Sequence, residues 1–142
     1  MKKLRPGFTL VELVIVLAIS GLIISLVFVA ASAAQRNGRD TTRRADTQKL
    51  ATAIEQWAVN NNGALPKDDA DILSLKTNGY LDASKFKDPG SGEEYVILVQ
   101  TFSPDPAACF TKYMVYIPDS VANPTKYRIE TCLEAGVFKY TP

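Results

Sequence analysis

Glu12 is the only charged residue among residues 8–34. Placing a carboxylate in a hydrocarbon environment costs about 2.5–3.5 kcal/mol at the centre of a helix and less toward its end. A chain that keeps an acid there is expected to use its charge. Pro6 and Gly7 stand just before this stretch, after a short basic tail. If the chain is cut after Gly7, the new α-amino group of Phe8 becomes a candidate partner for Glu12.

Other candidate chemistry is weak. The chain has no histidine, the commonest general base and metal ligand. The acidic run Asp68-Asp69-Ala70-Asp71 suggests calcium, but it lacks the spacing and the glycine of an EF-hand loop. A short helix capped by Asp69 and ended at Asn78-Gly79 explains the run better. The sequence therefore predicts no enzyme, no metal site and no cofactor.

The two cysteines, Cys109 and Cys132, lie 23 positions apart, which is not the spacing of a redox C-x-x-C motif. Outside the cytosol a disulfide between them is plausible, with a contribution of about 3 kcal/mol for a loop of this size. Two buried free thiols are the alternative.

The elements that position Glu12 begin with an uncharged apolar run. As a helix, residues 13–34 would extend roughly 33 Å, enough to cross a bilayer. A removable secretory signal ending near Ala34 is the alternative, but the apolar run is longer than such signals have and contains an acid. Lys2, Lys3 and Arg5 favour a cytoplasmic N-terminus, and the arginines of residues 36–44 oppose it. The cysteine pair favours a C-terminus outside.

The helical pattern continues to about Asn60, and the asparagines and Gly63 that follow end it. An apolar stripe recurs at three- and four-residue spacing: Thr47, Leu50, Ala51, Ile54, Trp57 and Ala58. The arginines of residues 36–44, with Asp40 and Asp46, are expected to form a solvated face. Pairing with acids of neighbouring subunits is the alternative.

Strand patterns at residues 95–102, 113–117, 127–132 and 137–140 follow, separated by turn formers. The predicted fold class is α+β: a long N-terminal helix, half transmembrane and half amphipathic, packed on a small antiparallel sheet of three or four strands. The soluble domain would be residues 35–142, with its helix at 35–60 and its sheet at 93–142. From residue 35 onward 13 basic and 14 acidic residues nearly balance, so no nucleic-acid partner is predicted.

The N-terminal sequence Lys-Lys-Leu-Arg-Pro-Gly-Phe-Thr-Leu-Val-Glu closely resembles the type IV pilin family, which includes secretion pseudopilins and competence pilins. The resemblance covers about the first 66 residues well and recurs weakly at Lys87-Asp88-Pro89. It implies a leader of residues 1–7, cleaved at Gly7 by a prepilin peptidase, and N-methylation of Phe8. A transmembrane and assembly helix of residues 8–34 would follow.

In that family the acid at Glu12 is thought to neutralise the N-terminal amine of a neighbouring subunit. Gly21 matches a position where pilin helices loosen in filaments. Val29 stands where the family usually has a proline, so the resemblance does not by itself extend this loosening to the present chain. The Cys109–Cys132 pair resembles the loop-closing disulfide common in pilins.

The resemblance implies a structural subunit that forms a homopolymer and depends on an assembly ATPase and a platform membrane protein. It would be a single-pass membrane protein with a cytoplasmic N-terminus, and after assembly part of a surface filament for adhesion, motility or DNA uptake. One alternative is a type II secretion or competence pseudopilin, suggested by the short length and Lys87-Asp88-Pro89. Another is a tethered or secreted binding domain that never polymerises.

Overall fold

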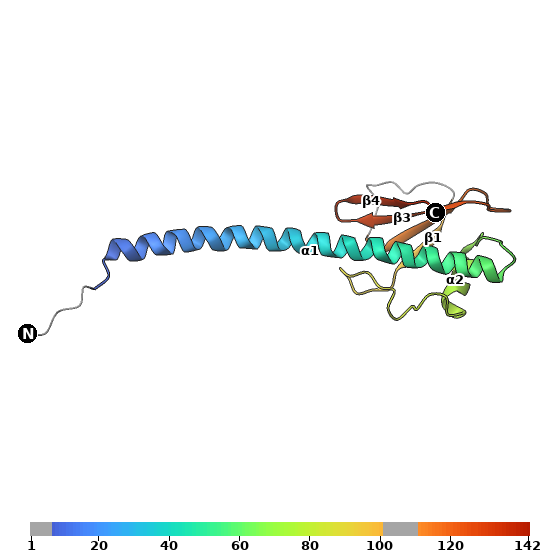
Figure 1. Cartoon of the computed structure of the whole chain (residues 1–142), viewed down its shortest axis with the longest axis horizontal. Helices are drawn as coiled ribbons and strands as arrows, with labels where there is room; N and C mark the ends of the chain where they lie inside the picture. Colours follow the sequence, from blue (N-terminus) through green and yellow to red (C-terminus); the bar gives the residue numbers. More distant parts are fainter. Residues whose placement is uncertain (1–6, 101–110) are drawn as a thin grey trace, which may run out of the picture. The chain divides into compact units, whose positions relative to one another are not determined.

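The computed structural model describes residues 7–100 and 111–142 (Figure 1). Two helices and four strands follow one another along the chain: α1 (Leu10–Asn60), α2 (Asp69–Thr77), β1 (Val96–Val99), β2 (Tyr113–Pro118), β3 (Tyr127–Leu133) and β4 (Gly136–Tyr140). The chain divides into two compact units, Met1–Asn37 and Gly38–Pro142. We call the second the globular unit.

The long helix α1 confirms the predicted helical pattern, and both of its ends have a local cause. Thr9 precedes the first turn and is its N-cap, as described below. At the other end Asn62 has a φ of 56° and Gly63 a φ of 82°. The Gly63 amide donates to the Ala58 carbonyl at 2.8 Å, the Schellman arrangement that ends many helices.

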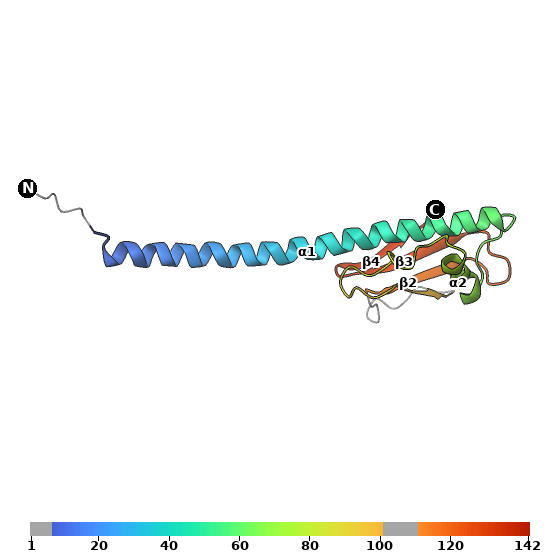
Figure 2. The same ribbon diagram turned by 90° about the horizontal axis from the view of Figure 1, so that it is seen from below.

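The predicted apolar stripe is buried and forms the core of the globular unit. Leu50 and Ile54 are fully buried, and Trp57 keeps only 8% of its surface exposed. Figure 2 shows the C-terminal part of α1 running along one face of the sheet. The core side chains on the sheet are Met114, Tyr116, Tyr127 and Ile129. Burial of this apolar surface stabilises the globular unit by about 25 cal/mol per Å² removed from water.

The α+β class and the four strands are confirmed, but the expectation of a wholly antiparallel sheet is wrong. The strand order is β1-β2-β3-β4. β3 pairs antiparallel with β2 and with β4, whereas β1 pairs parallel with β2, Val96 lying opposite Tyr113. A parallel pair needs a connection of about a dozen residues or more, and the segment between Val99 and Tyr113 is that long. The sheet is therefore mixed.

The short helix α2 confirms the capped helix start, with the cap one residue earlier than predicted. Asp68 has extended backbone angles, and its side chain accepts the Asp71 amide at 2.9 Å. Asp71 in turn accepts the Lys67 amide at 3.0 Å. These carboxylates are therefore occupied by backbone groups, and Asp69 is the first residue of the helix instead of its cap.

Candidate functional site

Glu12 lies in the first turn of α1 and is held by Thr9. The Glu12 Oε2 atom accepts the Thr9 amide at 2.8 Å and the Thr9 hydroxyl at 2.7 Å. The Glu12 amide donates back to Thr9 Oγ1 at 3.3 Å. This reciprocal arrangement is a capping box, which satisfies two amides that a helix start otherwise leaves without partners. Sequence reasoning missed the role of Thr9, although the pattern Thr-x-x-Glu before an apolar run predicts it.

The surface of α1 that follows Glu12 is apolar and uncovered. Large apolar side chains between Phe8 and Val29 are all more than half exposed. This part of α1 is long and apolar enough to cross a membrane. Such a surface is unfavourable in water and suits lipid or other apolar helices. The helix thus has the properties of a membrane anchor.

Three serines interrupt this apolar surface, and the helix backbone accepts a hydrogen bond from each hydroxyl. Ser20 donates to the Val16 carbonyl at 2.6 Å, Ser25 to Gly21 at 3.0 Å and Ser32 to Val29 at 2.9 Å. A hydroxyl satisfied in this way can lie in hydrocarbon without a further partner. The backbone of α1 is helical through Gly21.

The expected solvated face of arginines and acids is wrong for three of its members. Asp40, Arg43 and Asp46 are buried in the globular unit, with Arg43 only 1% exposed. Their partners belong to the same chain. Arg44 does lie on the exposed side, where its guanidinium stands 5.2 Å from the centre of the Phe138 ring.

Arg43 binds three carboxylates from three segments of the chain. Its Nε donates to Asp88 at 2.7 Å, and its Nη1 donates to Asp40 at 2.8 Å and to Glu134 at 3.3 Å. Arg39 also contacts Glu134 through two nitrogens, at 2.6 and 3.0 Å. We call Arg39, Asp40, Arg43, Asp88 and Glu134 the Arg43 cluster.

Backbone amides complete the coordination of these acids. Asp88 accepts the amides of Gly90 and Ser91 at 3.0 and 2.8 Å. Asp40 accepts the amides of Glu134 and Ala135 at 2.9 and 3.3 Å. A buried ion pair is tolerated when hydrogen bonds satisfy its remaining atoms. The cluster therefore fixes a loop and a hairpin turn on α1.

Electrostatics in the Arg43 cluster favour the charged forms. Burial alone would raise the pKa of Asp88, but hydrogen bonds from Arg43 and from the Ser91 amide outweigh it and lower that pKa. The hydrogen bond from Arg39 is the main cause that lowers the pKa of Glu134 to about 2. Nearby, Tyr95 donates its hydroxyl to Asp46 at 3.1 Å, and burial raises the pKa of that phenol.

Cys132 lies near the end of β3 and is buried. Cys109 lies outside the described residues, so the Cys109–Cys132 disulfide stays a prediction. Residues 1–6 of the predicted leader also lie outside them, and Gly7 and Phe8 are exposed at the start of the described chain.

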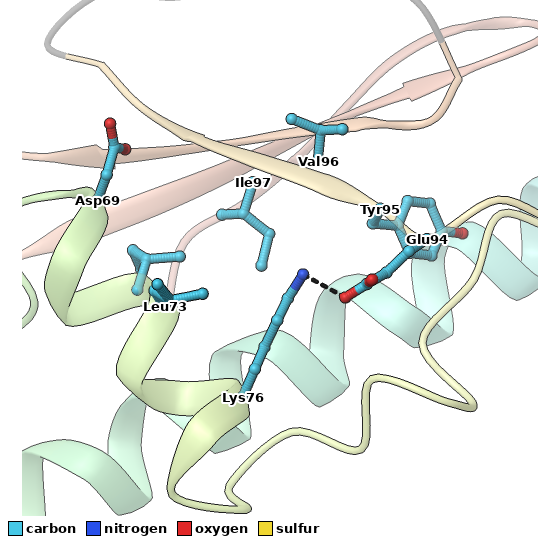
Figure 3. Close-up of a pocket in the computed structure, with 8 residues that line it drawn as sticks. Asp69, Leu73, Lys76, Glu94, Tyr95, Val96 and Ile97 are labelled. Carbon is cyan, nitrogen blue, oxygen red and sulfur yellow. Dashed lines mark hydrogen bonds and ion pairs between the residues drawn. The ribbon is translucent and has the colours of Figure 1, made fainter.

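A pocket of about 290 Å³ lies between α2 and β1. Figure 3 shows residues that line it. Lys76 and Glu94 form an ion pair across it at 2.5 Å, so their charges compensate each other. Much of the remaining wall is apolar, including Leu73 and Ile97. Within residues 7–100 and 111–142, no group of three histidine, cysteine or acidic residues could hold a metal ion. The pocket offers little for acid–base or metal chemistry.

A comparison with protein families matches residues 2–28 to the prokaryotic N-terminal methylation motif. Searches of curated proteins and of solved structures each found no match. The matched residues include the Gly7-Phe8 junction, the Thr9–Glu12 capping box and most of the exposed apolar surface of α1. The chain carries the type IV prepilin signature, that of a pilin-like or pseudopilin-like precursor.

Proposed function

We propose that this chain is a structural subunit that is cut between Gly7 and Phe8, methylated on the Phe8 amine and polymerised through α1 into a filament. The observation that carries the proposal is the methylation motif at residues 2–28, which coincides with a helix whose apolar side chains between Phe8 and Val29 are uncovered. Before assembly α1 would anchor the chain in the membrane, and in a filament it would pack against other copies. A prepilin peptidase would process the chain, and an assembly ATPase with a platform membrane protein would drive polymerisation.

Glu12 would pair with the Phe8 amine of a neighbouring subunit. Two unit charges about 4 Å apart attract by about 4 kcal/mol at an effective dielectric constant near 20. Desolvation of both groups offsets much of that energy. We therefore expect the pair to fix the axial position of one subunit relative to the next more than to strengthen their association. Cleavage comes first in this scheme because the amine of Phe8 exists only after it.

The domain limits follow the same scheme. Residues 1–7 would be the leader and residues 8–34 the membrane and assembly helix. Residues 35–142 would form the extracytoplasmic part, with the N-terminus in the cytoplasm before cleavage. A type II secretion or competence pseudopilin uses the same processing and the same helix, and it remains the second candidate. The resemblance at Lys87-Asp88-Pro89 and the short length are the features that favour it.

The test compares wild type with Glu12→Ala and Glu12→Gln in cells, with electron microscopy of filaments and N-terminal sequencing of the mature chain. Glutamine can still close the capping box, so Glu12→Gln removes the charge and keeps the helix start. We expect a mature start at Phe8 in all three and a loss of filaments in both variants. Normal filaments from Glu12→Gln would refute the charge pairing, and a start elsewhere would refute the processing.

A further inference from the structure

Within the globular unit, α1 packs in two chemically different ways. Over residues 38–49 every buried side chain is polar or charged: Asp40, Arg43, Asp46 and Thr47. Ala45 is the only apolar residue other than glycine in that stretch, and it is exposed. Over residues 50–57 the buried side chains are apolar: Leu50, Ala51, Ala53, Ile54 and Trp57. We call these the polar stretch and the apolar stretch of α1.

Arg43 links the polar stretch to two other segments of the chain, while Arg39 also pairs with Glu134, and Thr47 and Asp46 bond to Thr131 and Tyr95. Arg43 binds Asp88 of the loop before β1 and Glu134 of the turn between β3 and β4, while also binding Asp40. Gly90 allows the loop to approach, because a Cβ atom there would lie 2.9 Å from Arg43 Nη2. If Arg43 withdrew, Asp40 and Asp88 would both lose their guanidinium partner, while Glu134 would keep Arg39. The three segments are therefore expected to open together.

The two stretches also respond differently to water. Hydrogen bonds and ion pairs that open to solvent are largely replaced by bonds to water, so their net free energy is small once both partners are hydrated. Apolar side chains gain no comparable bonds from water. Separating the apolar stretch from the sheet therefore costs free energy in proportion to the apolar area that it exposes. Regions that lack buried apolar contacts open locally at a lower free energy than a core does.

We propose that the Arg43 cluster is a latch: the polar stretch, the loop at Asp88 and the turn at Glu134 open as one unit while the apolar stretch stays on the sheet. The latch gives the globular unit a second, partly opened conformation. In that conformation the loop and the turn are free of α1, and the carboxylates of Asp40 and Asp88 face water. The latch is a property of the folded chain and holds whether or not the chain forms filaments.

The test is hydrogen exchange of the full-length chain in detergent micelles, followed by mass spectrometry across a series of low urea concentrations. The reporters are the amides of the polar stretch, the Ser91 amide, which bonds to Asp88 within the loop, and the Glu134 amide, which bonds to Asp40 of α1. The Glu134 amide reports directly on release from α1. In wild type we expect these reporters to exchange about tenfold faster or more than amides of the apolar stretch, with weaker dependence on urea. The three groups of reporters should share one opening free energy.

Arg43→Gln should abolish most protection of all three groups while amides of the apolar stretch stay protected and Trp57 fluorescence stays native. Arg44→Gln is the matched control, because Arg44 is the exposed neighbour on the same helix and its ring contact, with Phe138 of β4, lies outside the Arg43 cluster. It should leave the reporters unchanged. If both stretches of wild type exchange with one free energy, or if the three groups open independently, the latch is refuted. Should Arg43→Gln fail to fold, the wild-type urea series decides alone.

Discussion

The contact between Thr47 of α1 and Thr131 of β3 allows a sharp test of how the helix binds the sheet. Both side chains are fully buried, and their hydroxyl oxygens lie 2.5 Å apart. Thr47 also donates to the Arg43 carbonyl at 2.9 Å. A hydroxyl has one proton to donate. Because Thr47 uses its proton within α1, Thr131 must be the donor in the contact between them.

This assignment predicts unequal costs for two substitutions of similar shape. Thr47→Val leaves the Thr131 hydroxyl buried without its acceptor, which costs about 1–3 kcal/mol. Thr131→Val removes one hydrogen bond but leaves Thr47 bonded to the Arg43 carbonyl, at a cost of about 0.5–1.5 kcal/mol. In the double variant the orphaned hydroxyl is gone. Its cost should therefore fall below the sum of the two single costs.

The measurement is urea unfolding of the full-length chain in detergent micelles, followed by the fluorescence of Trp57. Trp57 is the only tryptophan, and its indole nitrogen donates to Ser74 at 2.8 Å within the core region. Thr52→Val is the control, because Thr52 is exposed and bonds only to a carbonyl of its own helix. It should change stability by less than about 0.5 kcal/mol. A larger cost for Thr131→Val than for Thr47→Val, or strictly additive costs, would refute the proton assignment.

Three further outcomes are expected. The lowered pKa values of Asp88 and Glu134 mean that these acids stabilise the fold fully above the ordinary carboxyl pKa near 4. The free energy of unfolding should therefore fall as the pH is lowered from about 4 to about 2. Urea midpoints that stay constant over this pH range would contradict the prediction. Gly90→Ala should destabilise the globular unit by about 1–3 kcal/mol because its Cβ meets Arg43, and an unchanged midpoint would show that the loop yields easily. Thr9→Val should weaken the helix cap by about 1 kcal/mol and speed exchange of the first amides of α1 about fivefold, whereas Thr9→Ser should not; equal exchange in both variants would exclude the cap.

The parts of the fold that sequence reasoning predicted are those with a local periodic cause. The stripe at Leu50, Ile54 and Trp57 repeats with the period of a helix, and the strands are short runs of β-branched and aromatic residues between turn formers. The direction in which two strands pair has no such local sequence signal. Nothing in the residues of β1 indicates whether it lies parallel or antiparallel to β2. The connection between the two strands is long enough for either arrangement.

The Arg43 cluster was missed for a related reason. Arg43 lies 45 positions from Asp88 and 91 from Glu134, so neither partner shares a helix turn with it. Charge alternation in residues 36–46 is typical of an exposed helix face, and charged residues are rarely buried unless paired. Burial of Arg43 depends on the sheet bringing two distant acids to one place, which a single sequence does not show.

The capping box with Thr9 changes what can be expected of Glu12. From the sequence alone, Glu12 is a carboxylate without a partner in an apolar segment, which costs free energy. The amine that cleavage would create is one candidate partner. In the folded chain Thr9 already satisfies the carboxylate through two hydrogen bonds. In the proposed filament an incoming amine would have to add to the capping box or displace part of it, so the net gain would be smaller than the attraction of a bare ion pair. If the proposed pairing holds, a modest difference would keep the acid satisfied in the membrane-anchored chain until it meets a neighbouring subunit.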